Sequence, residues 1–299
     1  MTGRVLVVGD VMTDIIVVPE GPIIKGSDRR ASVRSRPGGS GANQAVWLGA
    51  MKADVWFAAR VGHADRALYE NYFRGLGVVP VLAGDTEQPS GVLVTLVDPD
   101  GERSFLTDRG ANLNLSAADL DDSLLAGVSL IMVSGYSLFA PGPRAAVLGL
   151  LAQARARGIA IAVDPASTGF LREVGPAQFL AWTAGGDWIF ANAEEAALLT
   201  GQQALEAQMA ALGAVFANVV IKRGALGAAL GGRDGVRLAL PAPAVTVVDS
   251  TGAGDAFAAG FIAALLRGAD EAAAMAAGIA AGARAVQAIG GQPPSEGLG

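Results

Sequence analysis

The run from Asp249 to Phe257 joins a glycine-rich turn to a carboxylate, a combination suited to phosphoryl transfer. Its small residues Gly252, Ala253 and Gly254 allow a tight turn with exposed backbone N–H groups, and the apolar stretch after them predicts a helix. A helix N-terminus offers unpaired donors and a partial positive charge to phosphate oxygens. Asp255 falls in the first helical turn, where a carboxylate would repel phosphate but could take a proton from a substrate hydroxyl as general base. The alternative is an ordinary helix cap, because Asp is common at helix starts.

A second glycine-rich run, from Pro37 to Ala45, precedes an alanine-rich helical stretch and offers groups suited to a neutral polyol. The backbone N–H groups of Gly38 and Gly39 and the side-chain amide of Asn43 could each bond a sugar hydroxyl. The run is not a dinucleotide fingerprint, because Gln44 stands where the third glycine is required, and the chain has no P-loop motif. A nicotinamide-dependent oxidoreductase is therefore disfavoured.

Composition excludes several other classes of protein. The chain has 299 residues, of which 52% are hydrophobic and 17% charged, as expected for a compact globular protein. It has no cysteine and one histidine, which excludes disulfides, thiolate catalysis and His-rich metal sites. The net charge is -6, without a dense basic cluster for nucleic acid. The apolar stretch Ala272 to Ala283 is too short to span a bilayer, and no signal-peptide core is present, so we expect a cytoplasmic protein without membrane or nucleic-acid partners.

Short β-branched runs alternate with helical stretches rich in Ala and Leu, which predicts an α/β fold with a mostly parallel sheet covered by helices on both faces. The expected strands are Val5–Val8, Val55–Ala58, Leu130–Ser134, Ile159–Asp164, Trp188–Ala191 and Val219–Lys222. The expected helices are Ala42–Met51, Asp65–Leu76, Pro143–Arg157, Ala193–Leu199, Gln202–Leu212, Asp255–Leu266 and Asp270–Gln287. Several strands end in polar or Gly residues, and ligands of such sheets bind outside the carboxyl ends of the strands.

Two pairs of strand-like segments lack helices to cover them. They lie within about residues 11–36 and 91–110, and the second pair flanks the turn Asp98-Pro99-Asp100-Gly101, a strong hairpin signal. We expect them to form a small antiparallel lid within a single domain spanning residues 1–299. Such a lid could close over substrate and exclude water, and its exposed strands could pair in a homodimer.

The two glycine-rich runs, in this order and roughly two hundred residues apart, resemble the two signatures of the ribokinase-like (PfkB) carbohydrate kinases. Gly9-Asp10 with Asp14, the Asn192–Glu195 run and the Lys222–Gly227 run are also similar to elements of this family, so the likeness spans nearly the whole chain. The resemblance implies a ribokinase-like fold and transfer of the γ-phosphate of ATP to a hydroxyl of a small sugar, either a ribose-like pentose or a ketose or keto-sugar acid. A nucleoside kinase of the family, or a catalytically silent sugar-binding protein with this fold, is the alternative.

The resemblance also implies roles for individual residues. Asp255 would be the base, and Gly252, Ala253 and Gly254 would form the anion hole for the transferred phosphoryl group. Acceptor contacts are implied for Asp14, Gly38, Gly39 and Asn43, and nucleotide contacts for Asn192, Lys222, Gly224 and Gly227. Glu195 would hold Mg²⁺ through water, and Asp249 would bind a monovalent cation such as K⁺ together with the Gly290–Ser295 loop.

Ordinary structural roles are open for several of the same residues. Asn192 and Glu195 could form a capping box, Lys222 could simply end a strand, and Asp14 could be a turn residue.

Departures from the family pattern bear on the acceptor. Ser40 stands where ribokinases proper have Lys, and Ser134–Leu138 carries no acidic residue after the central strand, so ribose is in doubt. The Ser134–Leu138 and Glu102–Phe105 runs resemble those of 2-keto-3-deoxygluconate kinases, and Arg109, at the exit of the lid hairpin, could pair with a substrate carboxylate. The Asp164–Ser167 stretch lacks the Arg expected for a keto-acid, however, so the acceptor stays open.

Overall fold

The main body of the protein is built on one large sheet. The computed structural model describes residues 3–97 and 103–293. Within them the sheet has nine strands in the order β13-β12-β11-β10-β9-β8-β1-β4-β5, parallel except for β12 and β13 at one edge. The strands are β1 (Arg4–Val8), β4 (Val55–Gly62), β5 (Val79–Asp85), β8 (Val128–Ser134), β9 (Ala160–Asp164), β10 (Trp188–Asn192), β11 (Asn218–Lys222), β12 (Ala228–Gly232) and β13 (Gly235–Leu240). The expected α/β architecture is confirmed.

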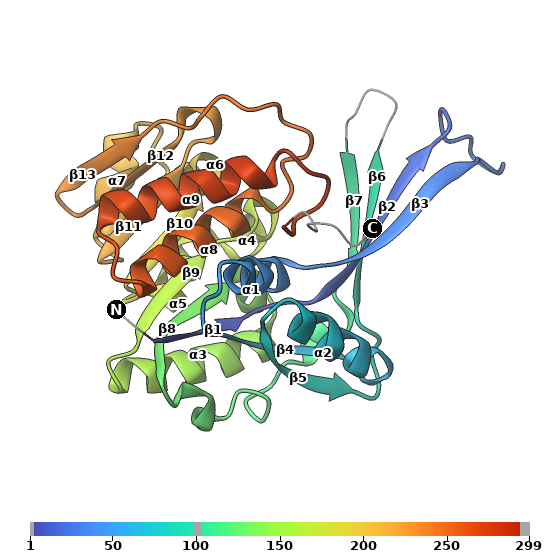
Figure 1. Ribbon diagram of the computed structural model, residues 1–299, viewed down its shortest axis with the longest axis horizontal. Coiled ribbons are helices and arrows are strands. Elements are labelled where there is room, and N and C mark those ends of the chain that lie inside the picture. Colours follow the sequence, from blue (N-terminus) through green and yellow to red (C-terminus); the bar gives the residue numbers. More distant parts are fainter. Residues whose placement is uncertain (1–2, 98–102, 294–299) are drawn as a thin grey trace.

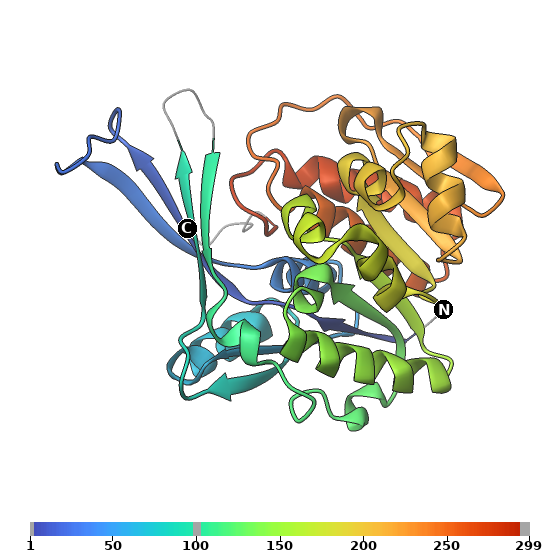
Figure 2. The same ribbon diagram turned by 180° about the vertical axis from the view of Figure 1, so that it is seen from behind.

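Helices cover both faces of this sheet, as Figures 1 and 2 show from opposite sides. Alternation along β1 divides the core: Val5 and Val7 pack with helices α1, α2, α8 and α9, whereas Leu6 and Val8 pack with helices α3 to α7. The helices are α1 (Ser40–Ala50), α2 (Arg66–Gly75), α3 (Pro141–Ala156), α4 (Thr168–Val174), α5 (Pro176–Thr183), α6 (Ala193–Thr200), α7 (Leu205–Gly213), α8 (Ala253–Leu266) and α9 (Glu271–Ala285). Short 3₁₀ turns are η1 (His63–Asp65), η2 (Gly110–Asn114), η3 (Asp122–Leu125), η4 (Gly135–Leu138) and η5 (Gly224–Leu226). Every described helix is too short or too polar to cross a bilayer.

The lid is a second sheet that projects from the body beside the carboxyl ends of the main strands (Figure 1). Its strands are β2 (Met12–Pro19), β3 (Ala31–Gly38), β6 (Gly91–Val97) and β7 (Arg103–Asp108), in the order β3-β2-β6-β7. Both hairpins are antiparallel as expected, but β2 and β6 join them in parallel register. The turn expected at residues 98–101 and the end of the Gly290–Ser295 run lie outside the described residues.

Candidate active site

One cavity of about 940 Å³ lies at the carboxyl ends of the main strands, beneath the lid. Both glycine-rich runs line it, together with lid residues such as Met12 and Asp14. The site residues expected from the sequence that line it are Asp14, Gly39, Asn43, Arg109, Asn192, Glu195, Lys222, Gly224, Gly227, Gly252, Ala253, Gly254 and Asp255. Gly38 and Asp249 are not among the lining residues. The fold therefore gathers segments from nearly the whole chain at one place.

The turn before α8 requires glycine at its first position. Gly252 has φ 71°, a left-handed conformation, and a Cβ there would lie 2.3 Å from the Cα of Gly291. No side chain caps the helix, and Asp255 is turned away from its own backbone toward α1. The ordinary capping role for Asp255 is therefore not what this geometry provides.

Three side chains of α1 donate hydrogen bonds to the carboxylate of Asp255. Ser40 Oγ and Gln44 Nε2 lie 2.7 Å and 3.1 Å from Oδ1, and Asn43 Nδ2 lies 3.2 Å from Oδ2. Burial, followed by the nearby charge of Asp164, raises the pKa of Asp255 to about 7 despite these donors. A fixed carboxylate with a pKa close to neutrality is suited to a general base.

The end of the cavity where the sequence predicts the acceptor, which we call the acceptor end, carries buried oxygens without partners. Within the described residues, Oδ1 of Asp14 and Oδ1 of Asn43 line the cavity and make no hydrogen bond. Burial and the neighbouring charge of Asp10 raise the pKa of Asp14 to about 7. Such orphaned acceptors fit a ligand that brings several hydroxyl donors. Gly38 packs behind Asp14, because a Cβ at Gly38 would lie 2.1 Å from Oδ2 of that carboxylate.

Arg109 already has a partner inside the protein. Its Nη1 lies 3.2 Å from Oδ2 of Asp10, and its guanidinium lies 4.8 Å from the centroid of the Tyr136 ring. Asp10 in turn accepts hydrogen bonds from Gly41 N and Ser134 Oγ. Arg109, which the sequence suggests as a partner for a substrate carboxylate, is thus paired with the buried carboxylate of Asp10. The sequence indicated Asp10 only as part of a family element.

Asn192 and Glu195, which the sequence predicts to lie beside a nucleotide and Mg²⁺, form the capping box at the start of α6. The N–H of Glu195 donates to Oδ1 of Asn192, and the N–H of Asn192 donates to Oε2 of Glu195, both at 2.8 Å. Burial, with the charge of Asp164 next, raises the pKa of Glu195 to about 7. Glu195 and Asp164 are two buried carboxylates on the cavity wall, and such groups suit a hydrated Mg²⁺. The described part of the chain contains no group of three His, Cys, Asp or Glu residues that could hold a metal directly.

Lys222 and Asp164 form an ion pair beside Gly254, in the turn predicted to form the anion hole. Nζ of Lys222 lies 2.8 Å from Oδ2 of Asp164. Burial alone would lower the pKa of Lys222, but the carboxylates of Asp164 and Glu195 raise it, so the ammonium stays charged. Sequence reasoning missed Asp164 as a site residue, although its position at the carboxyl end of an expected strand was a signal.

The remaining wall is apolar and lies beside η5. This apolar part of the wall includes Ala225, Ala242, Pro243, Ala244, Val245, Val247, Ile279, Ala283 and Val286. Gly227 has φ 83°, and a Cβ there would lie 1.9 Å from the carbonyl oxygen of Leu240. Only glycine lets the backbone come this close to Leu240. We call this apolar part of the cavity wall the apolar slot.

The loop around Gly291 connects the two glycine-rich runs. Gly291 lies between Gly252 and Asn43, and its carbonyl oxygen accepts a 2.9 Å hydrogen bond from Trp47 Nε1 of α1. Asp249 accepts hydrogen bonds from the N–H groups of Thr251 and Gly290, which fixes this loop against the turn before α8. Ile289 accepts from Arg36 of the lid.

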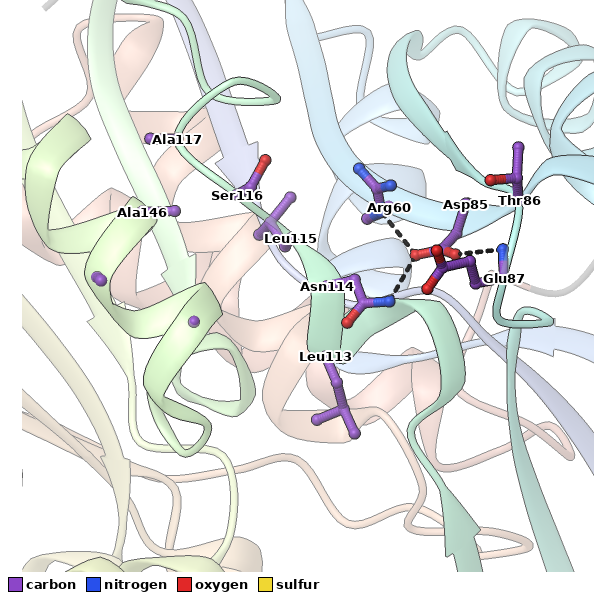
Figure 3. A pocket seen from close by; sticks show the side chains of 12 residues that line it. Arg60, Asp85, Thr86, Glu87, Leu113, Asn114, Leu115, Ser116, Ala117 and Ala146 are labelled. Carbon is purple, nitrogen blue, oxygen red and sulfur yellow. Dashed lines mark hydrogen bonds and ion pairs between the residues drawn. The ribbon is translucent and has the colours of Figure 1, made fainter.

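A second hollow, of about 620 Å³, lies on the body between β4, β5 and α3 (Figure 3). Its polar side chains bond one another: Arg60 pairs with Asp85 and Asp119 at 2.9 Å each, and Asn114 donates to Asp85 at 2.8 Å. Burial alone would raise the pKa of Asp85, but the hydrogen bonds from Arg60 and Asn114 hold it well below its usual range. This hollow contains none of the residues expected to act in phosphoryl transfer.

Comparisons with known proteins place the chain among kinases. Residues 2–297 match the family model for "pfkB family carbohydrate kinase". The ATP-dependent ribose-1-phosphate kinase of Halopiger xanaduensis is 31% identical over 284 residues, covering 89% of this chain and 86% of the relative. The fructokinase of Klebsiella pneumoniae is 28% identical over 284 residues, covering 89% of this chain and 85% of that protein. The structure of a probable sugar kinase from Rhizobium etli superposes with a TM-score of 0.87 at 24% identity, covering 99% of this chain and 96% of the other.

Proposed function

The chain belongs to the pfkB family of carbohydrate kinases, phosphotransferases with hydroxyl acceptors, and we propose that its acceptor is an uncharged sugar or sugar-like alcohol bound beneath the lid. The observation that carries this proposal is the charge at the acceptor end. Asp14 and Asp10 lie together there, and Arg109 is already paired with Asp10. Among the described residues at this end of the cavity, a carboxylate or phosphate on the acceptor would therefore meet two carboxylates and a single guanidinium, whose charge Asp10 already balances.

The geometry supports an in-line transfer with Asp255 as base. The acceptor hydroxyl gives its proton to the carboxylate of Asp255, and its oxygen forms a bond to the γ-phosphorus of ATP. The bond from this phosphorus to the β–γ bridging oxygen breaks, and its electron pair leaves with ADP. Asp255 then loses the proton to solvent. Ser40, Asn43 and Gln44 hold the carboxylate in place throughout, and the backbone donors of the turn before α8 face the transferred group.

The apolar slot beside η5 supports binding of adenine, because its lining residues are apolar and uncharged. Asn192, Lys222, Gly224 and Gly227 lie on the cavity wall and would contact the nucleotide. Glu195 would hold Mg²⁺ through water, and the metal would neutralise charge on the phosphates when bound.

Activation by K⁺ at Asp249 is part of the proposal as well. Asp249 is buried and braces the Gly290 loop against the turn before α8, so a cation here would act on the anion hole through this loop. Equal initial rates in K⁺ and in a tetraalkylammonium salt of the same ionic strength would contradict activation by K⁺.

The lid also supports a homodimer. Val33 and Leu106 are each 61% exposed, and the strand registers place both on one face of the lid sheet. A second copy of the chain would cover this apolar face. Leu106→Asp should then convert a dimer to a monomer in sedimentation, while Leu68→Asp, at another exposed leucine, should not.

The acceptor is tested by coupled ADP release with ribose, fructose, nucleosides, 2-keto-3-deoxygluconate and ribose-1-phosphate side by side. We expect a neutral compound to give the highest kcat/KM. Preference for the sugar acid or the sugar phosphate would overturn the charge argument. An absence of turnover with every acceptor would favour the catalytically silent binding protein.

A further inference from the structure

The active cavity contains more negative than positive charge. Among its lining residues, five carry carboxylates, whereas only Arg109 and Lys222 carry positive charge. Arg109 is bound to Asp10 and lies over Tyr136 at the acceptor end. A phosphoryl group in transfer develops negative charge that N–H donors alone stabilise less well than N–H donors with a cation. Within the described wall, Lys222 is the side chain that remains for this task.

The position of Lys222 suits that task. A Cβ built on Gly254, in the turn that begins α8, would lie 2.9 Å from Nζ of Lys222, so the ammonium rests against the glycine at the centre of the anion hole. Its side chain is 13% exposed, which keeps water from screening its charge fully.

Asp164 fixes this ammonium from the other side. The two residues end β9 and β11, and they meet across the end of β10, which lies between these strands. Oδ2 of Asp164 accepts from Lys222 at 2.8 Å, and Oδ1 accepts from the N–H of Ala166 at 2.9 Å. Ala166 itself has φ 71°, so the chain adopts an unfavourable conformation where it holds this carboxylate in place.

We propose that Lys222 is the catalytic cation that meets the transferred phosphoryl group, and that Asp164 is a positioning residue that holds its ammonium over the anion hole. This inference rests on the proposed function. An ammonium has three N–H donors, so one can stay on Asp164 while the others bond phosphate oxygens. Lys222 transfers no proton, because the acceptor proton goes to Asp255 and the bonding electrons leave with ADP.

Asp164 has a second consequence for catalysis. The negative charge of Asp164 opposes the binding of ATP in the ground state. Its ion pair with Lys222, however, holds a cation where the transferred phosphoryl group develops negative charge. Affinity for the triphosphate and turnover should therefore respond in opposite directions when this charge is removed.

The first test is nucleotide binding by Lys222→Met without any acceptor, measured by calorimetry with ADP and with a non-hydrolysable ATP analogue. Affinity for the analogue should fall about 10- to 100-fold, as for loss of a charge-assisted hydrogen bond, while affinity for ADP changes less than about threefold. Lys52→Met, in the exposed turn after α1, is the matched control and should change neither. Equal losses for both nucleotides, or no loss for either, would overturn the role of Lys222.

The second test compares Asp164→Asn with Asp164→Glu. The Asn variant removes the charge but keeps an oxygen for the N–H of Ala166, so it should bind the analogue several-fold more tightly and yet lose about tenfold or more in kcat. The Glu variant restores the charge and should return analogue affinity toward that of the wild type. A joint fall of affinity and kcat in Asp164→Asn would show a merely structural role and sink the proposal.

Failure of this inference can be told apart from failure of the proposed function. Binding of ADP and of the analogue requires no turnover, so it reports on Lys222 even if no acceptor is phosphorylated. ADP binding also shows that each variant is folded.

Discussion

Two hollows in this protein contain buried carboxylates, but the pKa values of these carboxylates are shifted in opposite directions. Beside Arg60, the carboxylate of Asp85 receives an ion pair and hydrogen bonds, and its pKa is lowered. In the cavity beneath the lid, the effect of burial on Asp14 and Asp255 is larger than the effect of their hydrogen-bond and charge partners. The pKa of each is therefore raised to about 7. Compensated charge stabilises a fold, whereas uncompensated charge is free to meet a ligand or a proton. The difference separates a structural network from a reactive site.

The largest expected effect tests the reactive side of this comparison. Asp255→Asn should lower kcat by about two to four orders of magnitude with little change in acceptor binding, because the amide cannot take the proton. Steady-state kinetics and acceptor titration measure the two quantities. Asp85→Asn is the matched control at the other hollow, and kcat should be unaffected by it. An unchanged kcat for Asp255→Asn would refute its role as base.

The substitution Arg60→Met tests whether the ion pairs of Arg60 with Asp85 and Asp119 stabilise the fold. Removing this partner leaves Asp85 and Asp119 unpaired, and the free energy of unfolding should fall by about 2–4 kcal/mol, somewhat less than for a fully buried pair since Arg60 is 20% exposed. Urea denaturation gives this value. The kcat/KM of the folded variant should equal that of the wild type. Altered kinetics with intact stability would mean that this hollow takes part in function.

The raised pKa of Asp255 predicts the pH dependence of activity. The base works only when ionised, so kcat/KM should rise with pH through a midpoint near 7 and level off above it. The charged or titratable groups around it are Lys222, Asp164 and Tyr136, and its hydrogen-bond donors come from α1. Asp164→Asn should move the midpoint to lower pH, because it removes a negative neighbour. A midpoint that stays in place would contradict this electrostatic link.

The smallest effect concerns stability. Between their ordinary pKa of 3.8 and the raised value of about 7, Asp14 and Asp255 bind more protons in the folded than in the unfolded chain. Their contribution to stability must therefore decrease as pH rises through this window. Asp85, whose pKa is lowered, contributes stability above its ordinary pKa and loses it only in stronger acid. Melting temperatures measured from pH 5 to 8 should fall less steeply in Asp255→Asn than in the wild type.

Much of the fold could be read from local sequence. The six apolar runs that predicted strands all occur in the main sheet, because a continuous β-branched run is buried on both faces there. Three strands of the main sheet, β5, β12 and β13, were missed. β12 (Ala228–Gly232) is made of alanine, glycine and one leucine and becomes a strand only by pairing with β11. The short helices α4 and α5 were missed for a similar reason, as neither has a sustained apolar period.

The candidate site was predictable where motifs are local and unpredictable where partners are distant. The turn before α8 and the position of Asp255 follow from adjacent residues. The pairing of Arg109 with Asp10, or of Lys222 with Asp164, joins residues 99 and 58 positions apart, and spacing in the sequence carries no information about either. Our proposals for the acceptor and for the transferred phosphoryl group depend on these two pairs, and both are contacts between distant residues.

The loop at Ile289–Gln292 has a consequence for when activity can arise during synthesis. Both glycine-rich runs, the base and the lid leave the ribosome before this loop, yet Gly291 fills the space between Gly252 and Asn43. A nascent chain halted at residue 285 would contain both glycine-rich runs and still lack Gly291, which lies between them. Both runs are therefore synthesised before the loop that lies between them, and they reach their final arrangement only when this loop has folded into place.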